Sequence, residues 1–418
     1  MLVRQRRSVP WQIAGAVLAL IAATVCAQMA GHEGHEGHDT GQAGDMTHGG
    51  MEMGKGGLMQ MPPAATWAPE GFVPSRAPHT GMQMGVVETL NTPALGYEMD
   101  GNVKVFHLFA QPIEYDMASG NPMDMSIVKE YNRFTGQLHG HYFRHRVRVW
   151  GYNGSSPGPT IECTQGDRIR VMLHNELPEP TSIHWHGIEL PNEMDGAGGL
   201  TEAPTPPGGM RVYEFTLYQN GTFLYHSGFN MMKQDSYGLA GFLVVHPKEY
   251  VIRPDRQICI MMQEWAFHPG NPNPDLVTMD FNWFTFNGMA APDIQRIDLR
   301  QGERVRIRFG NMSMDSHPIH IHGYTWKVVG TEGGPIPESA QWPGNTINVP
   351  PGSTRDVEFV AWNPGLWRLH CHKLHHIINA HADVPMGLMG HGGMFTIINV
   401  IPSDPEEPWQ HFSERGGE

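Results

Sequence analysis

Hydrophobic and polar positions alternate along two long stretches of the chain. Ile169, Val171 and Leu173 alternate with polar or charged neighbours, and Val305 and Ile307 do the same further along. A period of two is the pattern of a β-strand with one buried face. The 50 glycines and 34 prolines among 418 residues agree with short strands joined by many turns. The pattern therefore predicts an all-β protein.

An internal repeat runs through this alternating region. QGDRIRVMLHN at 165–175 recurs as QGERVRIRFGN at 301–311, and IHWHG at 183–187 recurs as IHIHG at 319–323. A third pair of segments, EFTLYQNGTFLYHSG and EFVAWNPGLWRLHCH, follows at nearly the same offset. Such self-similarity indicates that one structural unit occurs twice.

The repeat and the composition divide the chain. The two copies predict two Greek-key β-sandwich domains, at residues 95–248 and 249–402, followed by a tail at 403–418. Residues 1–27 have the basic start, apolar run and small residues of a signal peptide, with a membrane anchor as the alternative. Residues 28–94 form a leader rich in His and Met, with too few large apolar residues to fold. We therefore expect export, to a periplasmic or extracellular location.

The balance of charge excludes one class of partner. The formal net charge of -14 would repel the phosphates of nucleic acids, so no nucleic acid partner is expected. The same charge favours cationic substrates or metal ions. Thioethers and imidazoles of the leader suit copper, because soft sulfur binds Cu(I) and imidazole binds Cu(II).

Several histidines come in pairs separated by one residue. On a strand, both members of such a pair point to one face and the residue between them points to the other. One pair alone often has only a hydrogen-bonding role, but the HxHG pair recurs in both copies of the repeat. We therefore predict a metal site from three pairs: His184 and His186, His320 and His322, and His370 and His372.

The segment RLHCHKLHH places Cys371 between two histidines, so its sulfur must leave the strand on the face opposite to theirs. The thiol therefore belongs to a second site. Together with His376 and His317 it forms a His2Cys set, which suits an electron-transfer copper. Zinc also accepts Cys and His, but a structural zinc ion would give the histidines of the opposite face no role.

The first copy of the repeat lacks this second set. The equivalent positions hold Thr181, Ser227 and Met232. Neither imidazole nor thiol is present among them, so the first domain is expected to carry no electron-transfer copper.

The motifs HWHG, HSG, HPIHIHG and HCHKLHH resemble the four copper-binding patterns of the multicopper oxidases, the family of laccases and cuprous oxidases. The resemblance implies cupredoxin-like domains with one type 1 copper and a trinuclear cluster of type 2 and type 3 copper, about four copper ions per chain. The type 1 ligands it implies are His317, Cys371 and His376. The cluster ligands it implies are His184 and His320 for type 2, and His186, His226, His322, His370 and His372 for type 3.

Two positions depart from the family pattern. The second motif should end in histidine, but the chain has Gly228 there, so one type 3 ligand is missing. Either that copper is weakly held or another histidine replaces the ligand, the candidates being His79, His139, His141 and His145. The axial type 1 ligand is also open, and its candidates are His381, Met386 and Met389.

The resemblance also implies a reaction and an assembly. A phenol or a metal ion, with Cu(I) as one option, would give single electrons, and dioxygen would become water. Asp195 matches a family acid that relays protons, and His375 stands where some relatives have a glutamate proton donor. In two-domain relatives the cluster lies between subunits, so a homotrimer is expected.

Three alternatives remain open at this point. Cys163 and Cys259 could form a disulfide or remain buried free thiols. A copper nitrite reductase is also a trimer of two sandwich domains, although that family carries its type 1 cysteine in the first domain, beside one histidine. A protein that sequesters copper without turnover would keep the His/Met leader and tolerate the missing ligand.

Overall fold

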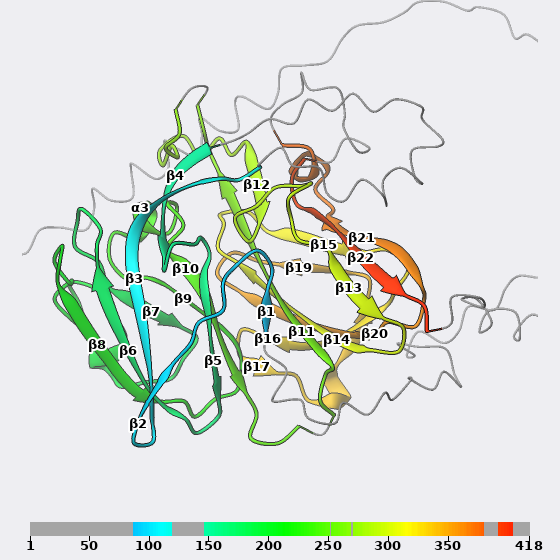
Figure 1. The fold of residues 1–418 in the computed structure, drawn as a ribbon, viewed down its shortest axis with the longest axis horizontal. Helices are drawn as coiled ribbons and strands as arrows, with labels where there is room; N and C mark the ends of the chain where they lie inside the picture. Colours follow the sequence, from blue (N-terminus) through cyan, green and yellow to red (C-terminus); the bar gives the residue numbers. More distant parts are fainter. Residues whose placement is uncertain (1–86, 119–145, 251, 269–270, 380–391, 404–418) are drawn as a thin grey trace, which may run out of the picture. The chain divides into compact units, whose positions relative to one another are not determined.

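The computed structural model describes residues 87–118, 146–250, 252–268, 271–379 and 392–403. In these residues the chain forms four β-sheets that make two sandwiches, with only short helical turns (Figure 1). The prediction of an all-β fold is confirmed. No helix in this part of the chain has the length and apolar character needed to cross a membrane.

The first sandwich consists of two sheets. One has the order β2-β3-β6-β8 with β4 beside β3: β2 (Glu98–Asp100), β3 (Val103–Asp116), β4 (Arg146–Tyr152), β6 (Arg168–Asn175) and β8 (Met210–Thr216). The other has the order β5-β10-β9-β7: β5 (Gly158–Thr164), β7 (Ile183–His186), β9 (Gly221–Ser227) and β10 (Ala240–His246).

The second sandwich also has two sheets. The larger has the order β1-β11-β14-β20-β16-β17, with β12 beside β11 and β18 beside β16: β1 (Glu88–Thr89), β11 (Arg256–Trp265), β12 (Trp283–Phe286), β14 (Arg304–Asn311), β16 (Trp326–Thr331), β17 (Gly334–Pro335), β18 (Trp342–Gly344) and β20 (Thr354–Val360). The smaller has the order β13-β22-β21-β15-β19: β13 (Ile297–Arg300), β15 (His317–Ile321), β19 (Thr346–Val349), β21 (Gly365–Cys371) and β22 (Phe395–Ile401).

The helical elements described are η2 (Asn192–Met194), α3 (Met231–Gln234), η3 (Glu338–Ala340) and η4 (Leu374–Ile377).

The two sandwiches share one topology, as the sequence repeat predicted. The order β3-β6-β8 corresponds to β11-β14-β20, and β5-β10-β9-β7 corresponds to β13-β22-β21-β15. In both, the first two strands of each order pair in parallel, whereas the others are antiparallel. The alternating residues have the burial expected of them, because Ile169, Val171, Val305 and Ile307 are fully buried.

Strand β1 joins the second sandwich although it precedes the first one in the chain. Glu88 and Thr89 pair in parallel with β11, and Leu90 is buried in the core of the second sandwich. The leader expected from the sequence runs to residue 94, so its last residues are ordered by packing that no local composition reveals. The Glu88 carboxylate accepts a hydrogen bond from Arg256 at 2.6 Å, which fixes the strand at the sheet edge.

A buried seam joins the sandwiches. Phe242 of β10 belongs to the same buried apolar cluster as Cys259 and Met261 of β11. Across this seam, Thr222 of β9 donates a hydrogen bond to Asp356 of β20 at 2.6 Å. Cys163 and Cys259 are both free and buried, so of the two alternatives left open by the sequence the structure has the free thiols.

Candidate metal centres

Cys371 is the last residue of β21, and its side chain lies in the core of the second sandwich. It is fully buried and pairs in register with Ile319 of β15. The flanking histidines leave the strand on the other face, since His370 pairs with His320 and contacts its ring. The register thus places Cys371 and His370 on opposite faces of β21.

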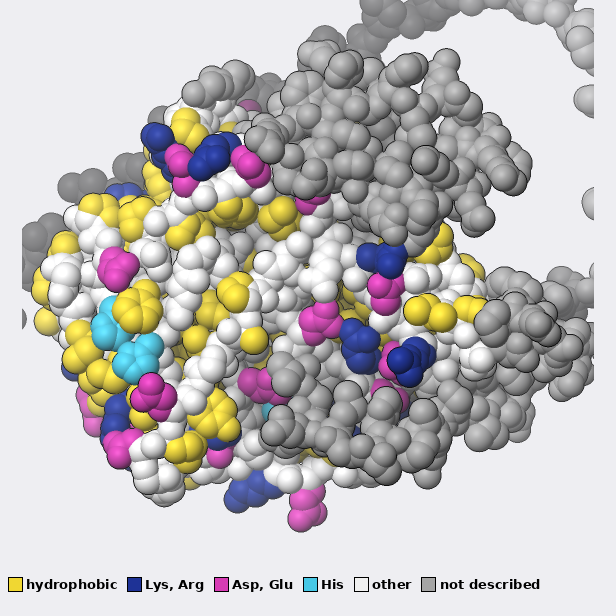
Figure 2. Space-filling view, viewed as in Figure 1, with side chains coloured by type: hydrophobic (Ala, Val, Ile, Leu, Met, Phe, Trp, Pro, Cys, Tyr) yellow, Lys and Arg dark blue, Asp and Glu magenta, His cyan; other side chains and the backbone are white. Residues whose placement is uncertain are grey.

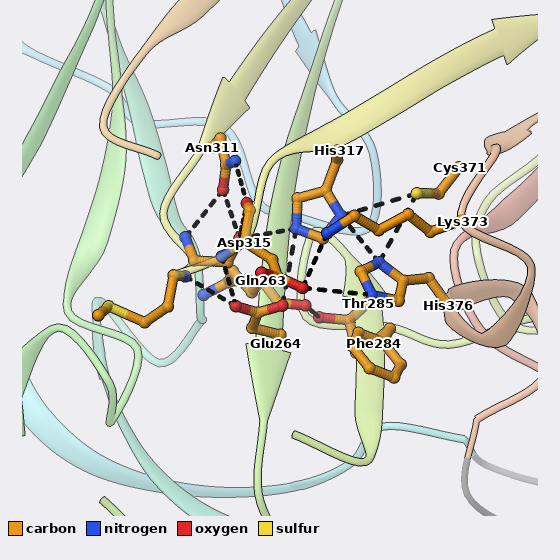
Figure 3. A network of polar contacts seen from close by, with 12 residues as sticks. Gln263, Glu264, Phe284, Thr285, Asn311, Asp315, His317, Cys371, Lys373 and His376 are labelled. Atoms are coloured by element: carbon orange, nitrogen blue, oxygen red, sulfur yellow. Dashed lines mark hydrogen bonds and ion pairs between the residues drawn. The ribbon is translucent and has the colours of Figure 1, made fainter. Parts of the chain in front are cut away.

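Three buried ligand atoms converge around Cys371 (Figure 3). Its Sγ lies 3.7 Å from Nδ1 of His317 and 3.7 Å from Nδ1 of His376, and the two Nδ1 atoms are 3.1 Å apart. A point equidistant from the three atoms lies about 2 Å from each, close to the lengths of metal bonds to imidazole nitrogen and thiolate. The geometry therefore fits a trigonal His2Cys metal site.

The electrostatics of this set also fit a metal. Burial lowers the pKa of His317 and of His376 to about 3, so both imidazoles are neutral near pH 7, as ligands must be. Burial raises the pKa of Cys371 to about 12, so the metal-free thiol is protonated near pH 7 and a metal has to displace that proton when it binds.

Neighbouring side chains hold the two imidazoles in place. The Ser313 hydroxyl lies 2.7 Å from Nε2 of His317, opposite to the converging Nδ1. The ring of Phe284, on β12, stacks on His376 with 4.0 Å between centroids. Neither residue was singled out in the sequence, because both act through contacts that no spacing rule describes. Their effect is to fix the rings before any ion binds.

Two acidic residues lie beside the same imidazoles. Oε1 of Glu264, on β11, accepts hydrogen bonds from the backbone N–H groups of Met314 and Asp315, while its Oε2 lies 3.9 Å from Nε2 of His317. The half-exposed Asp315 carboxylate lies 3.7 Å from Nε2 of His376 and 2.8 Å from Nζ of Lys373. This carboxylate links the buried set to the solvent.

Four histidines gather on the other face of β21 and β15. Nε2 of His322 lies 3.1 Å from Nε2 of His370, and the ring of His320 contacts those of His370 and His372. Nδ1 of His370 is 2.8 Å from the backbone oxygen of Cys371, and Nδ1 of His320 is 2.8 Å from that of Asn345. In these two rings Nδ1 is thereby fixed to the backbone, which leaves Nε2 to act as the ligand atom.

The first sandwich gathers three histidines in the corresponding place. His184, His186 and His226 offer ligand atoms within 4.8 Å of one another. Nδ1 of His226 lies 3.0 Å from the backbone oxygen of Ser227, which repeats the anchoring of His370 by the next residue. The contacts that define each histidine set lie within one sandwich, so each sandwich presents a partial ligand shell.

Multicopper oxidase models match residues 139–250 and 267–382. The chain belongs to the multicopper oxidase family. Copper resistance protein A of Pseudomonas syringae pv. tomato is 38% identical over 151 residues, which are 35% of this chain and 23% of that protein. The chain spans less than a third of the length of the copper resistance proteins that it matches.

Solved structures show the same fold. The blue copper oxidase of Nitrosomonas europaea has 25% identity and a TM-score of 0.55, over 71% of this chain and 85% of that one. A copper nitrite reductase of the same bacterium has 21% identity and a TM-score of 0.54, over 72% of this chain and 96% of that one, which shows a shared fold and nothing more. The two sandwiches are thus cupredoxin-like, as predicted.

Gly228, where the family motif has histidine, lies in a closed position. A Cβ built there would lie 1.9 Å from the backbone oxygen of Gly196 and 2.9 Å from Oγ of Ser182. The Gly228 N–H donates to the oxygen of Ser182, and its own oxygen accepts from Gly198. The turn after the HWHG motif therefore occupies the place of the missing side chain, and a replacement ligand has to come from elsewhere.

Other predicted ligands fall outside the described residues. These are the axial candidates His381, Met386 and Met389, and the replacement candidates His79, His139, His141 and His145. Their roles stay predictions.

The two predicted proton-transfer residues lie at different centres. Asp195 contacts the first histidine set, with Oδ1 at 3.5 Å and its backbone oxygen at 3.0 Å from Nδ1 of His184. His375 is exposed, and its ring contacts His376 and Phe284 beside the His2Cys set. The sequence also missed Asp235, whose Oδ2 lies 3.1 Å from Nδ1 of the buried His226.

Proposed function

We propose that this multicopper oxidase couples the one-electron oxidation of a small reducing substrate to the reduction of dioxygen to water, with about four copper ions per chain. The observation that carries the proposal is the convergence of His317, Cys371 and His376 on a buried point at one face of β21, with histidines on the other face. Bound copper would supply the electron transfer and the oxygen chemistry.

The chain's own part is to join and orient the two centres. Cys371 is bonded through the backbone to His370 and His372, so the His2Cys set and the histidine set are joined by consecutive residues of the chain. Asp195 contacts His184 and is partly exposed, and we propose that it relays protons there. His375, beside His376, would serve as a second proton carrier.

The cluster is proposed to form between subunits of a homotrimer. Its support is that the partial shell of three histidines and the partial shell of four belong to different sandwiches, as in two-domain relatives. Dilution to monomer should then release the cluster copper while His317, Cys371 and His376 keep theirs. Sedimentation combined with a count of bound copper measures both quantities.

A metal ion is the reductant that the surroundings of the His2Cys set favour, and Cu(I) is the first choice. The Asp315 carboxylate stands between the solvent and His376, and the chain carries a net charge of -14, so a cation would be drawn to this edge. Phenols remain the second class of donor. The N-terminal residues 1–27 support export of the protein.

Oxygen uptake and copper content test the function together. Copper-loaded protein should contain about four ions per chain and consume oxygen with Cu(I), with a simple phenol or with both. Uptake with neither donor would refute the oxidase and support a sequestering protein.

A copper nitrite reductase is the second candidate, and Gly228 is the observation that favours it, because the closed position beside Gly196 removes one type 3 ligand. A reductase would hold about two copper ions per chain and would reduce nitrite. The placement of Cys371 in the second sandwich between two histidines favours the oxidase.

A further inference from the structure

A cluster of imidazoles and thioethers lies on the outer face of the sheet β2-β3-β6-β8, on other strands than the histidine sets described so far. Histidine side chains are visible among hydrophobic ones over this part of the surface (Figure 2). In the parallel pair of β3 and β6, His107 is opposite Met172 and Phe109 is opposite His174. In the antiparallel pair of β6 and β8, His174 is opposite Met210.

The register places four donor side chains on one face. Residues two apart on a strand share a face, so Met172 and His174 project together, and their direct neighbours on β3 and β8 project with them. His107, Met172 and His174 are half-buried, and Met210 is exposed. Two imidazoles and two thioethers thus stand on adjacent strands about 4.8 Å apart, within reach of solvent.

The two imidazoles already meet at a distance that suits a shared ion. Nδ1 of His107 lies 3.0 Å from Nε2 of His174. Two nitrogens at this separation, each about 2.0 Å from one ion, subtend an angle of roughly 100° at that ion, as adjacent ligands do. The ring of Phe109 stacks on that of His174 with 4.4 Å between centroids, which restricts the rotation of the ligand ring.

The ionisation of His174 favours metal binding. Burial and the neighbouring His107 lower the pKa of His174 below its usual value, so its ring is neutral near pH 7. A neutral imidazole offers a lone pair to a metal without first losing a proton.

The donor types decide which ion fits. Thioether sulfur with imidazole nitrogen suits Cu(I), whereas Mn(II) and Fe(II) prefer sets that include carboxylates. The carboxylate on the neighbouring row of this face, Glu214, is engaged by Arg168 at 2.8 Å and Arg170 at 2.6 Å. The face therefore offers a soft, uncharged ligand set.

We propose that His107, His174, Met172 and Met210 form an accessory Cu(I)-binding site on the outer face of the first sandwich. The site is separate from the three sets at β7, β15 and β21, and it holds a cuprous ion without any oxidation step. It is independent of the proposed oxidase activity, because binding requires only the two strand pairs that carry the ligands.

An anaerobic Cu(I) titration of the full-length, copper-loaded and fully reduced protein against a chromophoric Cu(I) chelator tests the site. Wild type should bind one more Cu(I) per chain than the His174→Gln variant, since both retain the His/Met leader. The control is His268→Gln, which changes an exposed histidine on another strand connection, paired with Asp275 at 2.6 Å. That control should bind as many ions as the wild type.

Two further measurements locate the ion. Met210→Leu keeps both imidazoles and should weaken the affinity of this one equivalent about tenfold, through the loss of one soft ligand. Crystals of the copper-loaded protein soaked with Ag(I), a redox-inert substitute for Cu(I), should show an anomalous peak between His107 and His174. Equal Cu(I) binding by wild type and His174→Gln, or the absence of that peak, would overturn the proposal.

Discussion

The two sandwiches use the same backbone positions in opposite ways. In the second, His317, Cys371 and His376 bring three buried ligand atoms together. In the first, Gln234 occupies the centre of the equivalent space, where its Oε1 accepts hydrogen bonds from the hydroxyl of Thr181 at 2.7 Å and that of Ser227 at 2.5 Å.

The two spaces differ in the kind of buried polar groups that they hold and in the partners that these groups have. The two hydroxyls donate to the amide oxygen of Gln234. Its amide nitrogen donates to the Glu179 carboxylate and to the backbone oxygen of Pro180, so the polar groups in this space of the first sandwich have hydrogen-bond partners. In the second sandwich the three converging atoms are two imidazole nitrogens and a thiol sulfur, which an ion can bind together. Nε2 of His376, the other nitrogen of its ring, is buried without a hydrogen bond.

The prediction that Met232 stands at the position of His376 was wrong. Met232 is 64% exposed, whereas Gln234 is fully buried. The reason is local, because Asn230 has a left-handed backbone with φ 50° and starts the short helix α3, so the chain after β9 takes a different path from the chain after β21.

Replacing the thiol should have the largest effect. Cys371→Ser is expected to abolish the intense visible absorption of the copper-loaded protein, lower its copper content by one ion per chain and reduce oxygen uptake more than about a thousandfold, because no thiolate remains to hold an electron-transfer copper. Absorption spectra and copper analysis measure this. Cys163→Ser, at another buried free thiol, should keep the colour; loss of colour in both variants would contradict a specific role for Cys371.

Adding a side chain at Gly228 should destabilise the first sandwich strongly. A Cβ at 1.9 Å from the oxygen of Gly196 forces the backbone apart, so Gly228→Ala should lower the free energy of unfolding by about 3 kcal/mol or more. Urea unfolding of the metal-free protein measures the change. Gly96→Ala is the control, because nothing lies within 4 Å of its added Cβ. A stable Gly228→His variant with one extra copper would contradict the closed position.

Removing the amide of Gln234 should lower the stability of the first sandwich and leave the copper content unchanged. Gln234→Leu leaves the buried hydroxyls of Thr181 and Ser227 without their shared acceptor, which should lower the free energy of unfolding by about 2 kcal/mol. Copper content should stay at the wild-type value. Met232→Leu, at an exposed position of the same turn, should change neither quantity, and copper loss in Gln234→Leu would show that this network also supports a metal site.

The metal-free protein should lose stability as the pH rises towards 7, through a residue that the first sandwich lacks. Burial raises the pKa of Glu264 to about 7, whereas the register of β3 and β11 places Pro112 at the equivalent position. An acid that ionises near 4.5 when unfolded and near 7 when folded favours the unfolded state between these values, by up to about 3 kcal/mol above pH 7.

Glu264→Gln should remove that loss. The amide oxygen can keep the two backbone hydrogen bonds, so the variant should be more stable than the wild type at pH 8 and equally stable at pH 4. Urea unfolding of both metal-free proteins at the two pH values measures the difference. An equal gap at both pH values would show that the effect does not come from ionisation.

The smallest expected effect concerns the electron donor. Asp315→Asn should lower kcat/KM for Cu(I) a few-fold and leave a neutral phenol unaffected, because one exposed negative charge is removed beside His376. Steady-state oxygen uptake with each donor measures this. Glu179, which pairs with Lys233 at 2.5 Å at the equivalent place in the first sandwich, offers the control Glu179→Gln. An equal loss with the phenol would mean that Asp315 acts on the centre itself.

What the sequence could predict follows the range of the interactions involved. The faces of Cys371, His370 and His372 depend on strand geometry alone, so period-two spacing was sufficient. The closure over Gly228 depends on Gly196, and the orientation of His317 depends on Ser313 and the path of its loop. Such contacts are set by tertiary packing, which one sequence taken alone does not reveal.

The position of β1 has a consequence for any attempt to separate the two halves. A fragment starting at residue 249 would lack Glu88 and Thr89, and the backbone groups of Ile258 and Cys259 that pair with them would face water. Such an uncovered strand edge recruits other chains. The second half should therefore aggregate when produced alone, through this edge and through the apolar seam that Cys259 and Met261 share with the first sandwich. A peptide spanning residues 87–91 should reduce the part of the aggregation that arises at the edge.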